Sequence, residues 1–325
     1  MDYKLLMFDK YNEARPKSFC TLDCENLNSM ISIPSKYFDP RLKLILASLD
    51  GLVCLTSVNM KQFAFWNPLT GAYKMLPFNG YHSSNMRRSR DGIIGFYIDS
   101  SNDYKLLHIL LGGGNGDRAR AYIYSQRLDS WRDISINIDL NYKNTSSSYW
   151  FKATFSGQTL YFKLTSCRNS NEAIISFDVN TEVFKVIQYP PIYSGIFISS
   201  YSGCLVVLNG CIHLCVAYCG GKYDGYEWVL GDLWRLDGDE DGWVKVTAFP
   251  RSHSYIKDLR SQSISTTLSG NWFAIAEDNK NNKSFHKLSM EDFATNYWYF
   301  NDLGTVYTYC RTIYVETLIS PHPSE

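Results

Sequence analysis

The chain has 325 residues, with 32 Lys plus Arg and 32 Asp plus Glu, so its formal net charge is zero. This balance excludes a whole-chain attraction to nucleic acid or anionic lipid, which requires a basic surplus. An apolar fraction of 45% is too high for a disordered chain. No apolar run reaches the roughly 18 residues of a membrane span, and the charged start MDYKLLMFDK does not resemble a secretory signal. We therefore expect a cytoplasmic or nuclear protein.

The composition favours β-structure. The chain contains 24 Tyr, 18 Phe and 8 Trp, with many β-branched residues and no long helical period. Its 9 cysteines are odd in number and scattered, as expected of small buried apolar side chains in a reducing compartment. An all-β fold follows.

An internal repeat organises the chain. Each unit contains a short apolar strand, a polar turn and a second strand with an aromatic residue, and the turns recur about every 56 residues. Kelch propeller blades have about 50 residues in four strands. The clear copies span 63–76, 121–134, 173–187 and 232–246, with weaker copies at 3–24 and 284–300.

A second hairpin precedes each clear copy and completes a four-stranded blade. These inner hairpins are 44–55, 93–98 with 104–111, 153–155 with 159–164, and 205–208 with 211–216. Their nearly continuous apolar runs are typical of strands buried between neighbouring blades.

The two ends of the chain predict how the ring closes. We interpret strands 3–8 and 18–21 as the outer, third and fourth strands of a blade, and 312–319 as a lone last strand. Pairing of the last strand with the first pair of strands would hide strand edges that are otherwise exposed. We predict a single domain, 1–325, that is an all-β, six-bladed, kelch-like β-propeller closed by the C-terminal strand, with seven blades as the alternative.

The repeats resemble a known family. The motifs are DGLVCL (50–55), FWNPLTG (65–71), GFYIDSSNDYKL (95–106), DSWR (129–132), ISFD (175–178) and YVETLIS (314–320). In this order, from about residue 44 to 320, they resemble the F-box-associated propeller domain of plant F-box proteins, which include the S-locus F-box proteins.

The resemblance implies the target-binding half of a cullin ubiquitin ligase receptor. Family members usually begin with an F-box, a helical segment that docks onto a Skp-type adaptor. No such segment precedes the first predicted strand. We expect a propeller without its docking half, whether by truncation or by loss of the F-box.

Two patterns invite a metal interpretation. Cys211, His213 and Cys215 share one face of a predicted strand, but the cysteines would lie about 13 Å apart, too far for one zinc ion. The segment 237–242 resembles the start of a calcium loop, but Ala248 stands where a bidentate Glu is required. We expect buried thiols and a solvated turn, and no metal.

Catalytic motifs are absent from the sequence. The glycine-rich segment 112–117 lacks the Gly-Lys-Ser/Thr ending of a phosphate-binding loop, and neither a nucleophile elbow nor a His-Glu-x-x-His motif occurs. We predict no enzyme activity, no catalytic residue and no cofactor.

Loop lengths indicate where a partner would bind. The predicted turns on one side of the blades are short, whereas segments 78–91, 135–148, 189–202, 218–231 and 249–262 on the other side are long. Long loops on a rigid scaffold usually carry binding, and Tyr and Arg dominate protein–protein hot spots. The predicted partner-binding residues are Tyr81, Arg87, Arg88, Arg90, Tyr193, Phe197, Tyr201, Tyr223, Tyr226, Arg251, Tyr255 and Arg260.

Three functions stay open from the sequence. The first is a non-catalytic substrate-recognition propeller of an SCF-type ubiquitin ligase, whose partner is an unidentified protein, with an acidic or phosphorylated target as the candidate. A Skp-type adaptor and a cullin would join only through an F-box supplied elsewhere. The second is a stand-alone interaction propeller, and the third a propeller lectin or enzyme that uses the central channel. We expect no binding to nucleic acid or membrane.

Overall fold

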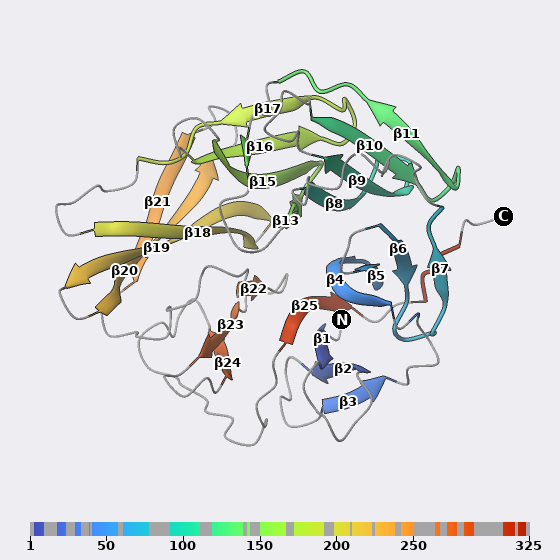
Figure 1. Cartoon of the computed structure of the whole chain (residues 1–325), viewed down its shortest axis with the longest axis horizontal. Coiled ribbons are helices and arrows are strands. Elements are labelled where there is room, and N and C mark those ends of the chain that lie inside the picture. Colours follow the sequence, from blue (N-terminus) through green and yellow to red (C-terminus); the bar gives the residue numbers. More distant parts are fainter. Residues whose placement is uncertain are drawn as a thin grey trace.

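The computed structural model of the chain describes residues 3–9, 18–23, 30–33, 39, 41–57, 61–77, 92–110, 119–138, 142–143, 150–166, 172–191, 198–208, 210–222, 225–237, 242–249, 264–266, 272–277, 283–288, 308–315 and 318–322. These residues form strands and turns and no helix (Figure 1). The all-β prediction is confirmed. In the same ranges no helix is long and apolar enough to cross a membrane.

The described strands form six sheets, numbered here from the N-terminus. Sheet 1 has the order β25-β1-β2-β3, with β25 Thr308–Val315, β1 Tyr3–Asp9, β2 Ser18–Asp23 and β3 Met30–Ile33. Sheet 2 contains β4 Leu42–Leu49, β5 Leu52–Ser57, β6 Phe63–Trp66 and β7 Tyr73–Met75. Sheet 3 contains β8 Gly92–Ile98, β9 Tyr104–Leu110, β10 Arg120–Ser125 and β11 Ser130–Ile134, and β13 Trp150–Lys152 pairs parallel to β8.

The remaining sheets follow the same antiparallel plan. Sheet 4 contains β12 Tyr142–Lys143, β14 Thr154–Ser156, β15 Thr159–Ser166, β16 Glu172–Asp178 and β17 Phe184–Ile187. Sheet 5 contains β18 Ile198–Leu208, β19 Cys211–Lys222, β20 Gly225–Asp237 and β21 Gly242–Phe249. Sheet 6 contains β22 Ile264–Thr266, β23 Trp272–Glu277 and β24 Lys283–Leu288. The four clear hairpins of the repeat are therefore paired strands, namely β6/β7, β10/β11, β16/β17 and β20/β21.

The tight turns have the backbone that hairpins require. Between β4 and β5, Asp50 and Gly51 both have positive φ, at 49° and 86°. This is the conformation of a two-residue turn that matches the twist of its strands, and Asp-Gly adopts it readily. Antiparallel strands reverse at each turn, so the β4–β5, β6–β7, β8–β9 and β10–β11 turns lie at one end of their sheets. We call this side of the molecule the turn face.

Apolar side chains on both faces of the strands pack neighbouring sheets together. All residues of β5 are buried. Its Val53 and Leu55 belong to a buried cluster shared with sheet 1, and its Leu52 and Cys54 to a cluster shared with sheet 3. Similar clusters join sheet 3 to sheet 4 and sheet 4 to sheet 5. Burial on both faces explains why these strands show continuous apolar runs.

The first strands of the six sheets lie against one another around a common centre (Figure 1). β25 contacts β4, β4 contacts β8, β8 contacts β14, β14 contacts β18, β18 contacts β22, and β22 contacts β25. β25 also pairs with β1, so both ends of the chain contribute to one sheet.

The N-terminal strands take other places than the sequence predicted. β1 lies second in sheet 1, β2 third and β3 fourth, because β25 supplies the first strand. The interpretation of 3–8 and 18–21 as third and fourth strands is wrong. The last strand spans 308–315 rather than 312–319. The short strand β3 at 30–33 was not predicted.

Candidate interaction surface

The β8–β9 turn is built around Asp99. One Asp99 carboxylate oxygen accepts hydrogen bonds from the Ser101 amide at 2.9 Å, the Ser101 hydroxyl at 2.7 Å and the Asp103 amide at 3.0 Å. The other oxygen pairs with Lys105 Nζ at 2.6 Å. Desolvation opposes ionisation of Asp99, but the bonds from Lys105, Ser101 and the Asp103 amide outweigh it and lower the pKa of Asp99 to about 2. The carboxylate stays charged and orders the turn.

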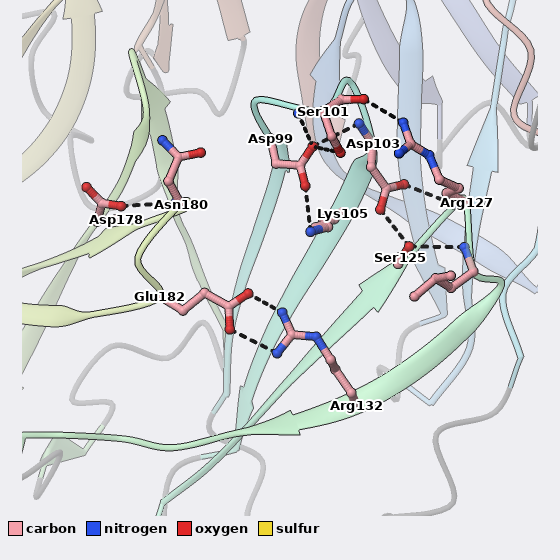
Figure 2. Close-up of polar contacts among 11 residues, drawn as sticks. Asp99, Ser101, Asp103, Lys105, Ser125, Arg127, Arg132, Asp178, Asn180 and Glu182 are labelled. Atoms are coloured by element: carbon pink, nitrogen blue, oxygen red, sulfur yellow. Dashed lines mark hydrogen bonds and ion pairs between the residues drawn. The ribbon is translucent and has the colours of Figure 1, made fainter.

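Asp103 joins this turn to the β10–β11 hairpin. The Asp103 side chain accepts hydrogen bonds from the Ser125 hydroxyl at 2.6 Å and from the Arg127 amide at 2.9 Å. Asp103 is only 6% exposed. The Arg127 guanidinium in turn donates to the Ser101 carbonyl. Figure 2 shows the two turns held together by these bonds.

A shallow pocket of about 330 Å³ lies between the two turns. Its lining includes Ser101, Arg127, Leu128, Ser130 and Arg132. The Asp99 and Asp103 carboxylates of the lining are engaged by the bonds described above. Arg127 is exposed and has N–H donors besides the one that bonds to the Ser101 carbonyl. Ser130 is also exposed, and Leu128 is 70% exposed. The surface therefore offers cationic and hydroxyl donors beside an apolar side chain. This combination suits a carboxylate or phosphate next to an apolar residue.

A charged pair continues this surface onto sheet 4. Arg132 in β11 makes a two-pronged ion pair with Glu182, which precedes β17 (Figure 2). The Glu182 carboxylate raises the pKa of Arg132. Glu182 lies in the turn between β16 and β17. In this turn Asp178 accepts hydrogen bonds from the Thr181 and Asn180 amides, which lower the pKa of Asp178. The pair ties two neighbouring sheets at the turn face.

Almost none of the sequence-predicted partner residues can be placed. Of the predicted set, Tyr81, Arg87, Arg88, Arg90, Tyr193, Phe197, Tyr223, Arg251, Tyr255 and Arg260 lie outside the described residues. Only the backbones of Tyr201 and Tyr226 are described. Both residues belong to strands, Tyr201 to β18 opposite Tyr218 and Tyr226 to β20 opposite Gly221.

The predicted long loop at 218–231 is wrong. Strands β19 and β20 continue through it and leave only residues 223–224 between them. Gly220 and Gly221 indicated a loop, but their backbones pair with Glu227 and Tyr226 in the ladder. The end of the predicted loop 189–202 is likewise strand, since β18 begins at Ile198.

Sequence reasoning missed the pocket. In the sequence, the segment 99–103 is recognisable only as part of the family-like motif at 95–106. Its signal was the uninterrupted run Asp-Ser-Ser-Asn-Asp at 99–103. Side chains of these types bond to nearby backbone amides and form tight turns. Asn102 indeed has a φ of 58°, a conformation that Asn tolerates.

The two metal-like patterns fall in a strand and a hairpin. Cys211, His213 and Cys215 lie in one strand, β19, as predicted. The expectation of buried thiols is confirmed for Cys215 and is wrong for Cys211, which is exposed near the start of the strand. Burial lowers the pKa of His213. Residues 238–241 are outside the described ranges, but they join β20 to β21, which pair as a hairpin. In the described part of the chain no three His, Cys, Asp or Glu residues are grouped to hold a metal ion.

Comparison with known families gives a match over most of the chain. The model of the F-box associated beta propeller domain matches residues 5–290. In Arabidopsis thaliana, the F-box/kelch-repeat protein At1g12870 is 22% identical over 264 residues, covering 74% of this chain and 57% of that protein. The F-box protein At2g07140 is 30% identical over 148 residues, covering 44% of this chain and 35% of that protein. The chain thus spans only part of the length of these relatives.

Two solved structures resemble the chain in fold. A chain of a nidogen/laminin complex superposes with a TM-score of 0.53 at 12% identity, covering 97% of this chain and 99% of that one. TolB from Acinetobacter baumannii gives a TM-score of 0.50 at 13% identity, covering 90% of this chain and 62% of that one. Identities this low show a shared fold alone.

Proposed function

Because the chain belongs to the F-box associated β-propeller family, we propose that it is a non-catalytic propeller that recognises a protein target for an SCF-type ubiquitin ligase. The observation that carries this proposal is the family match over residues 5–290, supported by relatives that are F-box proteins. The protein works in the cytoplasm or nucleus, where such a ligase would meet its target.

The proposed scaffold is a six-bladed propeller closed by its C-terminal strand. Six sheets, the chain of contacts between their first strands and the pairing of β25 with β1 support it. Such closure hides the two edges that β1 and β25 would otherwise expose, because the two strands pair along them.

The pocket at the turn face is the proposed target site. Its exposed Arg127 and Ser130 would bind a carboxylate or phosphate, and Leu128 would contact a neighbouring apolar residue. An acidic or phosphorylated segment is the target chemistry that these groups fit. Arg87, Arg88 and Arg90 are a second, sequence-based candidate for the same chemistry.

Two single substitutions at opposite ends of β10 locate the site. Arg127 lies in the turn two residues after the end of β10, whereas the exposed Arg120 is the first residue of that strand. We expect R127E to weaken capture of an acidic target and to flatten its salt dependence. R120E is the matched control. Loss of binding in R120E, or only in an R87E/R88E/R90E variant, would place the site away from the pocket.

The ligase role needs a separate test. The chain is expressed in plant cells alone and with the F-box of a relative such as At1g12870 fused to its N-terminus. Proteins recovered with both forms should become ubiquitylated and depleted only in the presence of the F-box, and a proteasome inhibitor should restore them. Partners that bind but never change in ubiquitylation would instead indicate a stand-alone interaction propeller. Recovery of the Skp-type adaptor and a cullin with the chain alone would show that it enters the ligase by itself.

A further inference from the structure

The segment 318–322, which follows the last strand, lies across the turn face and is bound there through its backbone. Asn67 Nδ2 donates to the Ile319 carbonyl at 2.8 Å. Gln126 Nε2 donates to the Ser320 carbonyl at 3.1 Å and to the His322 carbonyl at 3.2 Å. Asn67 directly follows β6 of sheet 2 and Gln126 directly follows β10 of sheet 3, and the C-terminal end lies beside β7 in Figure 1.

The side chains of this segment alternate in burial. Ile319 packs against the buried cluster of sheets 2 and 3, which includes Phe65 and Tyr124. Pro321 is buried, whereas Leu318 is 83% exposed. Two apolar side chains, two positions apart, thus face the propeller while three backbone carbonyls receive hydrogen bonds. Proteins bind extended peptides in this way, with main-chain bonds for affinity and alternate side chains for specificity.

The two amides that bind the segment are positioned by the propeller itself. Asn67 Oδ1 accepts hydrogen bonds from the Leu69 and Thr70 amides at 2.9 and 3.2 Å, and this fixes the opposite end of the side chain, Nδ2, toward Ile319. Gln126 is only 6% exposed, and its backbone amide donates to the Tyr104 carbonyl at 2.9 Å. None of these supporting bonds involves the segment. The surface would therefore keep its donors if the segment left.

We infer that this tail-binding surface, formed by Asn67, Gln126 and the apolar cluster beneath Ile319, is a peptide-binding site that the chain's own C-terminal segment occupies. Its other ligand is an extended target segment with a branched apolar residue two positions before a proline. The identity of that ligand as a target rests on the proposed function, but the site itself does not. The tethered segment is present at a high effective concentration, so it lowers the apparent affinity for any free peptide.

A synthetic peptide with the sequence of residues 316–323, labelled with a fluorophore, tests the inference by anisotropy. In the full chain, I319S/P321S removes both apolar anchors and should release the segment. We expect this variant to bind the peptide at least about tenfold more tightly than the unaltered chain, because the site is no longer occupied. L318S alters an exposed position of the same segment and should behave as the unaltered chain.

The donors of the site are tested in the same assay. Q126E replaces the donating amide by a carboxylate of the same shape that faces two carbonyls. Added to I319S/P321S, it should abolish peptide binding. Equal binding with and without Q126E, or a release variant that binds no better than the unaltered chain, would overturn the inference.

A measurement on the unaltered chain covers the case in which the release variant does not fold, as judged by near-ultraviolet circular dichroism. Excess peptide should displace the segment and speed deuterium uptake in the C-terminal peptic fragment. Unchanged uptake at about 1 mM peptide, the effective concentration expected of a short tether, would overturn the inference. These outcomes involve neither the ligase nor a cellular target, so failure here is distinct from failure of the proposed function.

Discussion

The indole ring of Trp66 in β6 packs against the phenyl ring of Phe19 in β2, with ring centroids 5.0 Å apart. Both side chains are 0% exposed. The two strands belong to neighbouring sheets, and Phe19 lies in the sheet that contains both ends of the chain. This contact is one place where the packing of sheet 1 against sheet 2 depends on a single large side chain.

Replacing Trp66 by Ala should lower the free energy of unfolding by about 3–5 kcal/mol, because the removed ring leaves a cavity that rigid neighbouring strands cannot fill. Urea titration followed by circular dichroism measures the loss. F19A should produce a similar loss, and the two substitutions together should cost less than the sum, since each removes the same contact.

Trp131 is the control for this prediction. Both tryptophans lie in hairpins of the internal repeat, but Trp131 is only partly buried. Its ring contacts Phe63 and Tyr124, and its Nε1 donates to the Pro77 carbonyl at 2.8 Å. We expect W131A to cost less than W66A. A loss as large as that of W66A would contradict burial as the cause.

Gly95 in β8 marks a close approach between sheets 3 and 4. A Cβ added there would lie 2.6 Å from Leu160 Cδ1 and 3.1 Å from the Ala153 Cβ. Gly95→Ala should therefore destabilise the chain by about 1–3 kcal/mol through overpacking. The melting temperature reports the loss. Shortening the opposing side chain with L160V should recover part of it, and strict additivity of the two substitutions would show that the steric explanation is wrong.

The Arg132–Glu182 pair should contribute little to stability. The two side chains are 47% and 26% exposed, so water and salt screen their attraction. A double-mutant cycle with R132A and E182A should give a coupling of about 0.2–1 kcal/mol that falls in high salt. A coupling that is large and independent of salt would mean that the pair is more desolvated than its exposure indicates.

Local patterns were enough to predict most of the hairpins. Asp50-Gly51 encodes a tight turn, and the apolar runs on either side of it encode two buried strands. The hairpin at Lys222–Gly225 was missed, although Asp224-Gly225 is a typical turn sequence. Gly220 and Gly221 lie close to it, and the whole segment 218–231 was interpreted as one long loop. Gly220 and Gly221 nevertheless belong to strand β19, because each pairs with a residue of β20.

The candidate sites depend on contacts that no local pattern contains. Asp103 orders the pocket by reaching Ser125 and Arg127 on another hairpin. The bond from Asn67 to Ile319 joins residues 252 positions apart. Such pairs form only after the sheets have packed, so the sequence indicated turn-forming residue types but not the surface that they build.

The acid sensitivity of the β8–β9 turn follows from Asp99. Its pKa is lowered from 3.8 to about 2 in the folded chain, so the unfolded state takes up the proton first as the pH falls. The contribution of Asp99 is therefore fully present above about pH 5, and it is lost progressively as the pH falls through 4 toward 2. A shift of this size corresponds to about 2 kcal/mol. Its side chain is only 12% exposed, so solvent screening removes little of this value.

Asp99→Asn keeps the shape of the side chain but removes its charge and leaves Lys105 without its partner. At pH 7 the variant should be less stable than the unaltered chain by about 2 kcal/mol or more. The difference should narrow below pH 4 and reach roughly half its neutral value near pH 3, because the unaltered Asp99 is then losing its advantage. Urea unfolding of both proteins at pH 7, 5, 4 and 3 gives the difference directly and cancels the titration of the other carboxylates. A difference that stays constant down to pH 3 would show that the Asp99–Lys105 pair does not set the acid response of this turn.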